Sequence, residues 1–463
     1  MGDRRTAHLR KAAAAAVCLI AALTPLLTPA PAMAQSAPMT LIRDTEIEEI
    51  LRLESEPLFK VAGLESSSIR ILLIGSKDLN AFAGPGVMAI FTGLILESKS
   101  PNELQGVIAH EVAHLAGGHS ARSGEMSQAG LRPFLLTMGL GVLAALAGNV
   151  EAGAVMASNA GFFGALGAMG YSREQESRAD QAGASYLEAA GLSGRGLVNF
   201  FDNFRYQEVF AEARRFGYFR SHPLSSSRID ALRARVERQS NFNTPDSPES
   251  LRRHAIMKAK LHGFINPGLA VVKCAEPNAD YPTRYACAIA QYQLKEPDRA
   301  LKLIDALLAE QPDNPYLWEL KGQILFEFGR TVEAEAPQRR SVSLKPDAPL
   351  LRVNLGQTLI ALPDPSKVED GIGELKIAVG QDDQNSVAWR LLAQAYDSRG
   401  RDGLARYATA EYNYIEGDRR QALIFALRAR ELLERNTPEW RRANDIVLAT
   451  ENDRQVRNVR GDD

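Results

Sequence analysis

Hydrophobic residues recur at helical spacing along most of this chain, and strand-like stretches are confined to its N-terminal part. Residues 41–63 predict a helix, because apolar positions recur every three to four residues. Residues 68–76 and 87–92 are short apolar runs that predict two strands, with a turn at 81–86 between them. More helices are predicted through 194–240. The first half is therefore expected to be mainly α with a small β-sheet.

The helix that follows the second strand has clear signals at both ends. Ser100 begins it as a capping residue, with Pro101 at the first helical position and Glu103 three residues after the cap. It is expected to end at Gly117-Gly118. A later helix is expected over 172–191.

The C-terminal half repeats. Pro312 and Pro346 are 34 residues apart, as are Gly322 and Gly356, and Trp389 begins a related unit. This period is typical of tetratricopeptide repeats, helix pairs that bury their apolar faces only by stacking on their neighbours. An ordinary helical bundle is the alternative. A stack of such repeats would leave a concave groove that binds peptides or proteins.

The N-terminus has the composition of a secretory signal peptide. Basic residues within 1–11 precede the apolar run Ala12–Leu27, and the small-residue site Ala32-Met33-Ala34 follows. A transmembrane anchor is the alternative, but the run is short and contains prolines. We therefore expect cleavage before Gln35 and a secreted mature protein.

Composition narrows the partners. The 463 residues include 54 Lys+Arg and 56 Asp+Glu, so the basic excess typical of nucleic-acid binding is missing, and we predict no nucleic-acid partner. After removal of the signal peptide the cysteines are Cys274 and Cys287. In an oxidising compartment they could form a disulfide, or they could remain two buried thiols, and the sequence leaves both open.

The candidate chemistry begins with the motif His110-Glu111-Val112-Ala113-His114, which falls on the helix capped by Ser100. His110 and His114 are one turn apart, so their imidazoles share a face and could bind one Zn²⁺. Glu111 would then lie near the open coordination position. A chance match on a solvated helix is the alternative, so the motif needs a third ligand.

A later helix offers that ligand. Glu176 and Asp180 are also one turn apart. Glu176 could complete a site of two histidines and one glutamate, and Asp180 could orient a ligand histidine. We therefore predict one Zn²⁺ per chain, bound by His110, His114 and Glu176.

Such a site predicts peptide-bond hydrolysis. Zinc lowers the pKa of a bound water to about 7 and polarises the scissile carbonyl. Glu111 would take the water proton and return it to the leaving amine. His222, in Ser221-His222-Pro223, is a candidate donor to the developing oxyanion, with Arg220 as the nearest alternative. A structural role for His222 before a proline turn also stays open.

With these motifs the chain resembles the zinc metallopeptidases related to the CAAX prenyl endopeptidase and HtpX, in particular their periplasmic, BepA-like branch with C-terminal tetratricopeptide repeats. The resemblance rests on four stretches: 80–86 with 92–94, 110–114, 176–180 and 221–223.

The resemblance implies a role for each of these stretches. His110, His114 and Glu176 match the zinc ligands, and Glu111 matches the catalytic base. His222 matches a histidine that either stabilises the oxyanion or occupies the water site as a plug. The first stretch resembles an active-site edge strand, which implies that a substrate binds by strand addition along Val87, Met88, Ala89, Ile90 and Phe91.

The glycine- and alanine-rich stretch 134–172 is apolar but short in each of its parts. We expect helices that cover the active site, with a peripheral contact to the membrane surface. A true membrane span is the alternative.

The expected fold class is a zincin-like α+β protease domain, mainly α with a small β-sheet, followed by an α-helical tetratricopeptide solenoid. The expected parts are a signal peptide (1–34), a zinc metallopeptidase domain (35–240), a linker and first helix (241–280), a tetratricopeptide domain (281–450) and a polar tail (451–463).

The expected function is a periplasmic zinc endopeptidase that cleaves unfolded or misassembled proteins. The resemblance implies quality control of outer-membrane proteins, with repeats that dock clients or the outer-membrane assembly machinery. The alternative is a latent or non-proteolytic chaperone or scaffold that acts through its repeats.

Overall fold

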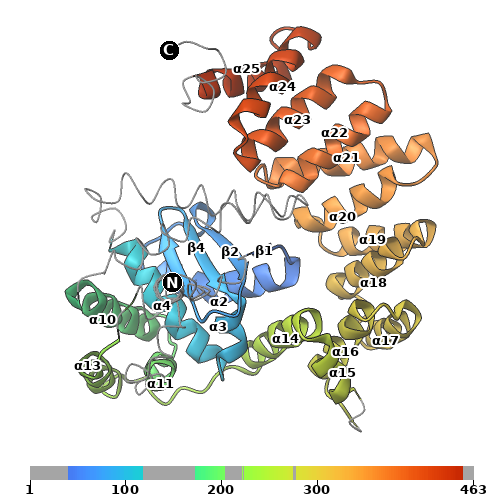
Figure 1. The fold of residues 1–463 in the computed structure, drawn as a ribbon. Helices are drawn as coiled ribbons and strands as arrows, with labels where there is room; N and C mark the ends of the chain where they lie inside the picture. The colour runs from blue at the N-terminus through green and yellow to red at the C-terminus, as the bar shows by residue number, and fades with distance from the viewer. Residues whose placement is uncertain (1–39, 118–172, 204–221, 223, 275–277, 452–463) are drawn as a thin grey trace, which may run out of the picture. The chain divides into compact units, whose positions relative to one another are not determined.

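The computed structural model describes residues 40–117, 173–203, 222, 224–274 and 278–451 (Figure 1). The expected signal peptide, the stretch 134–172 and the tail after Glu451 lie outside these residues. Within the described ranges, no helix combines the length and the apolarity that a membrane span requires.

A four-stranded mixed sheet lies in the N-terminal part, in the order β1-β2-β4-β3. The strands are β1 (Thr40–Ile42), β2 (Arg70–Gly75), β3 (Ala81–Gly84) and β4 (Val87–Phe91). β2 pairs with β1 in antiparallel and with β4 in parallel orientation, and β3 and β4 form an antiparallel hairpin. Gly86, at the hairpin turn, has a φ of 73°, a backbone conformation that favours glycine.

The expected position of the substrate-binding edge is wrong. Val87, Met88, Ala89, Ile90 and Phe91 form β4, which pairs with β2 along one edge and with β3 along the other. Because both edges of β4 are already hydrogen-bonded, a substrate strand cannot add to it. Among the four described strands β3, expected to be a turn, lies at the end of the sheet.

Helices surround the sheet in the first half: α2 (Thr45–Val61), α3 (Thr92–Glu97), α4 (Pro101–Ala116), α10 (Arg173–Ala189), α11 (Arg195–Asp202) and α13 (Ser226–Val236), with a 3₁₀ turn at Ser66–Ser68. α4 is buried from Pro101 through His114. Glycines allow two helices to approach it closely. A Cβ on Gly106 would lie 2.7 Å from the Leu197 backbone of α11, and one on Gly183 would lie 3.2 Å from the Ala109 backbone. This close packing brings α10 and α4 together.

The segment 241–280, expected to be a linker with one helix, contains α14 (Pro248–Ile265) and α15 (Pro267–Lys273). Met257 and Leu261 of α14 are buried in the same hydrophobic cluster as Leu51 of α2. α14 therefore packs as part of the core.

The C-terminal part is a succession of helix pairs (Figure 1). They are α16 (Tyr281–Gln293) with α17 (Pro297–Glu310), α18 (Pro315–Glu327) with α19 (Thr331–Leu344), α20 (Pro349–Ile360) with α21 (Pro365–Gln381), α22 (Ser386–Ser398) with α23 (Asp402–Glu416), and α24 (Arg419–Leu432) with α25 (Pro438–Glu451). The repeated glycines lie where paired helices touch, since a Cβ on Gly322 would lie 2.6 Å from Gln338 and one on Gly356 2.6 Å from Leu375. The expected fold class is confirmed.

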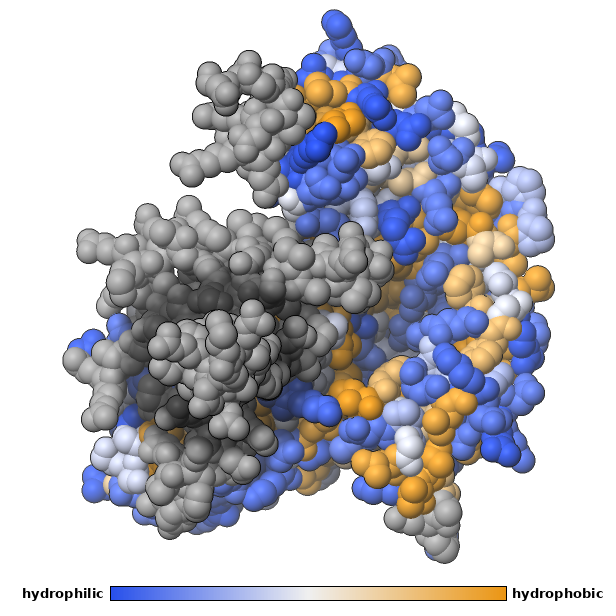
Figure 2. Space-filling view, viewed as in Figure 1, coloured by the Kyte–Doolittle hydropathy of each residue, from blue (hydrophilic) through white to orange (hydrophobic). Residues whose placement is uncertain are grey.

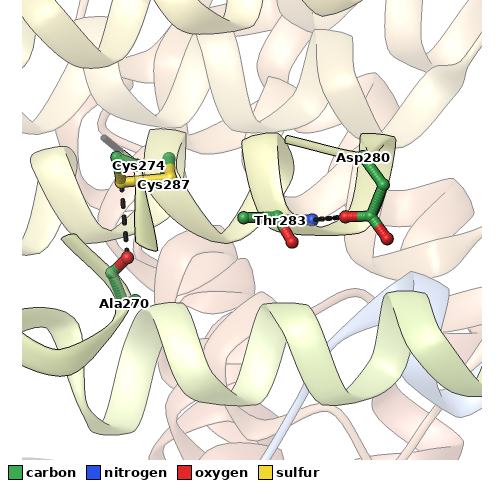
Figure 3. Close-up of a disulfide and its surroundings, with 5 residues drawn as sticks. All are labelled: Ala270, Cys274, Asp280, Thr283 and Cys287. Carbon is green, nitrogen blue, oxygen red and sulfur yellow. Dashed lines mark hydrogen bonds between the residues drawn. A yellow bond between two sulfur atoms is a disulfide. The ribbon is translucent and has the colours of Figure 1, made fainter. Parts of the chain in front are cut away.

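A disulfide joins Cys274, at the end of α15, to Cys287 in α16, with 5.7 Å between the Cα atoms (Figure 3). Asp280 caps α16 by accepting a hydrogen bond of 2.9 Å from the Thr283 amide. Of the two alternatives for these cysteines, the structure contains the disulfide.

Not all large apolar side chains are buried. Leu269 and Val272 of α15 are 72% and 70% exposed, and Figure 2 shows hydrophobic surface over this helix. Single exposed residues of this kind are common on protein surfaces.

Candidate metal centre

Two histidines of α4 form the base of the site. Ser100 caps the helix by accepting a hydrogen bond of 3.2 Å from the Glu103 amide, as the sequence predicts. One turn apart, His110 and His114 bring their Nε2 atoms to 3.1 Å from each other. Both side chains are buried.

Glu176 of α10 meets these histidines. Its Oε2 is 3.4 Å from Nε2 of His110, and its Oε1 is 3.5 Å from Nε2 of His114. The close approach of α10 to α4 at Gly183 makes this meeting possible. The structure thus brings together the three residues that the sequence selects as zinc ligands.

His222 completes a group of four. Its Nδ1 lies 3.3 Å from Nε2 of His110 and 3.1 Å from Oε1 of Glu176. Potential ligand atoms of His110, His114, Glu176 and His222 all lie within 4.8 Å of one another, and all four residues are buried.

The spacing of these atoms suits a single metal ion. Zinc ligands at 2.0–2.1 Å in tetrahedral geometry are about 3.3–3.4 Å apart. Five contacts between the four side chains, which involve both oxygens of Glu176, are 3.1–3.5 Å, and one potential ligand atom from each residue lies within 4.8 Å of the others. Three imidazoles and one carboxylate are also ligand types that zinc accepts. The donor set and its spacing therefore both fit zinc.

Glu111 borders this group and is itself buried. Its Oε1 lies 3.5 Å from Nε2 of His222, whose Nδ1 faces the ligand atoms. The predicted base and the predicted oxyanion donor are thus neighbours, and the imidazole of His222 lies between Glu111 and the ligand set.

Asp180 lies where the sequence predicts a supporting residue. Its Oδ1 is 3.1 Å from Nδ1 of His110, the ring nitrogen opposite the ligand atom. A carboxylate at this nitrogen holds the ring orientation and leaves Nε2 for the metal.

Arg228 of α13 is a residue of the centre that sequence reasoning missed. Its guanidinium binds Asp180 through two hydrogen bonds of 2.8 and 2.9 Å and lies 3.2 Å from Oε2 of Glu176. Ser225 caps α13 by accepting a hydrogen bond from the Arg228 amide. In the sequence, this capping serine is the signal that places Arg228 at the start of a helix. An arginine in the first turn of a helix is ordinarily solvated, so the signal was weak.

Opposing charges couple the ligand set. Burial lowers the pKa of His110, but the Asp180 and Glu176 carboxylates raise it to about 10. Burial also raises the pKa of Glu176, but the His222 and His110 imidazoles hold it well below its usual range. The metal-free centre therefore favours protonated histidine beside ionised carboxylate, and a metal ion would replace the histidine protons.

Together, two helices that supply a His-Glu-x-x-His motif and a distant glutamate define a metallopeptidase of the zincin type. The comparisons agree. Residues 43–236 match the model of peptidase family M48, and residues 285–349 match a tetratricopeptide-repeat model. A protease HtpX of Stenotrophomonas maltophilia is 30% identical over 207 residues, which are 38% of this chain and 68% of that protein.

The chain belongs to peptidase family M48, a family of metalloproteases. Two longer relatives also match most of the chain. A putative beta-barrel assembly-enhancing protease of Vibrio cholerae is 26% identical, over 85% of this chain and 82% of its own length. A beta-barrel assembly-enhancing protease of Yersinia pestis is 24% identical, over 84% and 80%.

Proposed function

We propose that the chain is a zinc-dependent endopeptidase of the periplasm, which cleaves unfolded or misassembled proteins during outer-membrane protein assembly. The observation that carries the proposal is the buried cluster of His110, His114, Glu176 and His222 beside Glu111. Zinc held by His110, His114 and Glu176 would activate a water molecule near neutral pH and polarise a peptide carbonyl.

The chain's own residues then divide the work. His110, His114 and Glu176 hold the metal, and Asp180 keeps His110 in its ligating orientation. Glu111 accepts the proton of the attacking water and passes it to the leaving amine. Burial of all these groups strengthens their electrostatic interactions, because little water is present to screen them.

His222 acts as a plug in this conformation. A catalytic zinc site has three protein ligands and keeps its fourth position for water. The Nδ1 of His222 lies 3.1–3.3 Å from atoms of Glu176 and His110, close enough that it would take that fourth position on a bound zinc ion. Cleavage therefore requires His222 to move away. This arrangement also supports the second candidate, a latent protease that works mainly through its repeats.

The repeats dock the client or the assembly partner. Five helix pairs follow the protease domain, and stacked pairs of this kind form extended concave binding surfaces. The two longer relatives are named for enhancement of beta-barrel assembly, and they match this chain over both parts. Protein clients and the outer-membrane assembly machinery are therefore the proposed partners.

The periplasm is the proposed location for two reasons. The N-terminal sequence has the composition of a signal peptide. The disulfide between Cys274 and Cys287 is of a kind that persists in oxidising compartments.

A casein-cleavage assay on the full-length mature protein with measured zinc content tests the proposal, with Glu111→Gln and His222→Ala in parallel. We expect cleavage by the parent, more cleavage by His222→Ala, and zinc without cleavage in Glu111→Gln. Zinc-loaded parent and His222→Ala that both fail to cleave would contradict the protease and support the scaffold. Lower activity in His222→Ala would contradict the plug and favour an oxyanion role.

A further inference from the structure

The buried guanidinium of Arg228 touches two carboxylates that serve the same metal ion. We propose that Arg228 is a positioning residue, which holds Glu176 directly and His110 through Asp180 in the arrangement that binds the metal. The inference rests on the proposed zinc site. It assigns a supporting role to Arg228, a residue that does not itself bind the metal.

The first set of contacts leads from Arg228 through Asp180 to His110. Nε and Nη2 of Arg228 bind the two oxygens of Asp180 at 2.8 and 2.9 Å, a bidentate pair. The Oδ1 of Asp180 then meets Nδ1 of His110 at 3.1 Å. Since Arg228 holds both oxygens, the carboxylate of Asp180 cannot turn about its own axis. The ring of His110 therefore has one orientation.

The same guanidinium also orients Glu176. Nη2 lies 3.2 Å from Oε2 of Glu176. The other oxygen, Oε1, lies 3.5 Å from His114 and 3.1 Å from His222. Oε2 itself lies 3.4 Å from Nε2 of His110 and 3.2 Å from Nδ1 of His222, so Arg228 holds the carboxylate of Glu176 against the ligand atoms.

Charge explains why an arginine is present at this depth. The side chains of Arg228, Asp180 and Glu176 are 5%, 2% and 0% exposed. Buried carboxylates without compensating charge are costly, and a ligating histidine must be neutral. Arg228 supplies positive charge to both carboxylates through direct contacts of 2.8 and 3.2 Å.

The environment of Arg228 holds it in place. It lies in the first turn of α13, whose cap Ser225 accepts from the Arg228 amide at 3.4 Å. Its guanidinium carbon is 5.8 Å from the centre of the Phe201 ring, within the range of a cation–π interaction. A lysine would keep the charge but could not form the bidentate pair.

The test measures zinc affinity by chelator competition in the full-length protein, for the parent, Arg228→Gln and Arg228→Lys. The matched control is Arg235→Gln, an exposed arginine of the same helix that donates to Ser185. Loss of residues that support metal ligands typically weakens binding about 10–100-fold. We expect that loss in Arg228→Gln, a smaller loss in Arg228→Lys and no change in the control.

Thermal unfolding separates positioning from simple stabilisation. We expect a smaller zinc-induced rise in Tm for Arg228→Lys, with a metal-free Tm close to that of the parent. A double-mutant cycle with Asp180→Asn should be non-additive in zinc affinity, because both changes break one chain of contacts.

Folded Arg228→Gln with parental zinc affinity would overturn the inference and leave the proposed function intact. If Arg228→Gln does not fold, Arg228→Lys decides, and parental zinc affinity in that variant would overturn the inference. A parent that binds no zinc would contradict the proposed function itself and the inference with it.

Discussion

The metal centre and the helical repeats use charged residues in opposite ways. In the metal centre His110, Glu176 and His222 are buried and contact one another, and His222 also contacts the buried Glu111. In the repeats, ion pairs such as Arg330–Glu333 are exposed to solvent, and the core consists of apolar side chains. Buried charge networks lose several interactions when one member is removed, whereas exposed ion pairs contribute little. Polar substitutions should therefore damage the first region, and apolar truncations should damage the second.

The largest effect is expected for His110→Ala, which removes a metal ligand. Zinc affinity should fall by more than about 100-fold, beyond the loss typical of a supporting residue. Chelator competition measures it, with the exposed His262→Ala of α14 as the matched control. Full zinc retention by His110→Ala would refute the ligand assignment.

The repeats should respond to loss of packing. Leu375 of α21 is fully buried beside Ile372 and Trp389. Leu375→Ala should lower the free energy of unfolding by about 2–5 kcal/mol, whereas the exposed Ile377→Ala should change it by less than about 0.5 kcal/mol. Denaturant unfolding measures both. Zinc affinity should stay at the parental value, and a loss in Leu375→Ala would mean that the two regions are energetically coupled.

The disulfide should stabilise the start of the repeats. Cys274 and Cys287 are separated by 13 residues, and closing a loop of this size contributes about 3 kcal/mol. Replacement of both by alanine should lower Tm to that of the reduced parent. Added reductant should not change the Tm of this double variant. A parent whose Tm does not change with reductant would contradict the disulfide.

The smallest effect is a dependence of stability on pH. Burial raises the pKa of Glu319 to about 8, opposed by Lys260 and assisted by Asp44 and Glu46. Because the pKa in the folded protein lies above the ordinary glutamate value of 4.5, Glu319 contributes stability below about pH 4.5 that is lost as pH rises through 8. Across this pH range the free energy of unfolding of the parent should fall by on the order of 1 kcal/mol, after allowance for screening by solvent. Glu319→Gln should show no such fall.

The matched control for this pH dependence is Glu333→Gln, which removes an exposed acid. Urea unfolding at pH 5, 7 and 9 provides the comparison. Parallel stability profiles for Glu319→Gln and the parent would contradict the assignment.

The helices and the ligands were predictable because their signals are local. A cap, a proline or a recurring apolar position lies within a few residues of the structure it predicts, as Ser100 and Pro101 do for α4. The motif spacing likewise places His110 and His114 on one face without any tertiary information.

The rest depends on contacts between distant segments. Strand β3 has the sequence Ala-Phe-Ala-Gly, too short and too small for a clear alternating pattern, so the order of the sheet was not apparent. Arg228 approaches Asp180 across 48 residues of sequence, and His222 approaches Glu176 across 46. No local pattern encodes either pairing.

The four-residue metal centre is tested most directly by counting the imidazoles bound to zinc in the full-length protein. X-ray absorption at the zinc edge reports it through outer-shell scattering from histidine rings. We expect three bound imidazoles in the parent, from His110, His114 and His222, and two in His222→Ala. Two imidazoles in the parent would contradict the closed four-ligand centre.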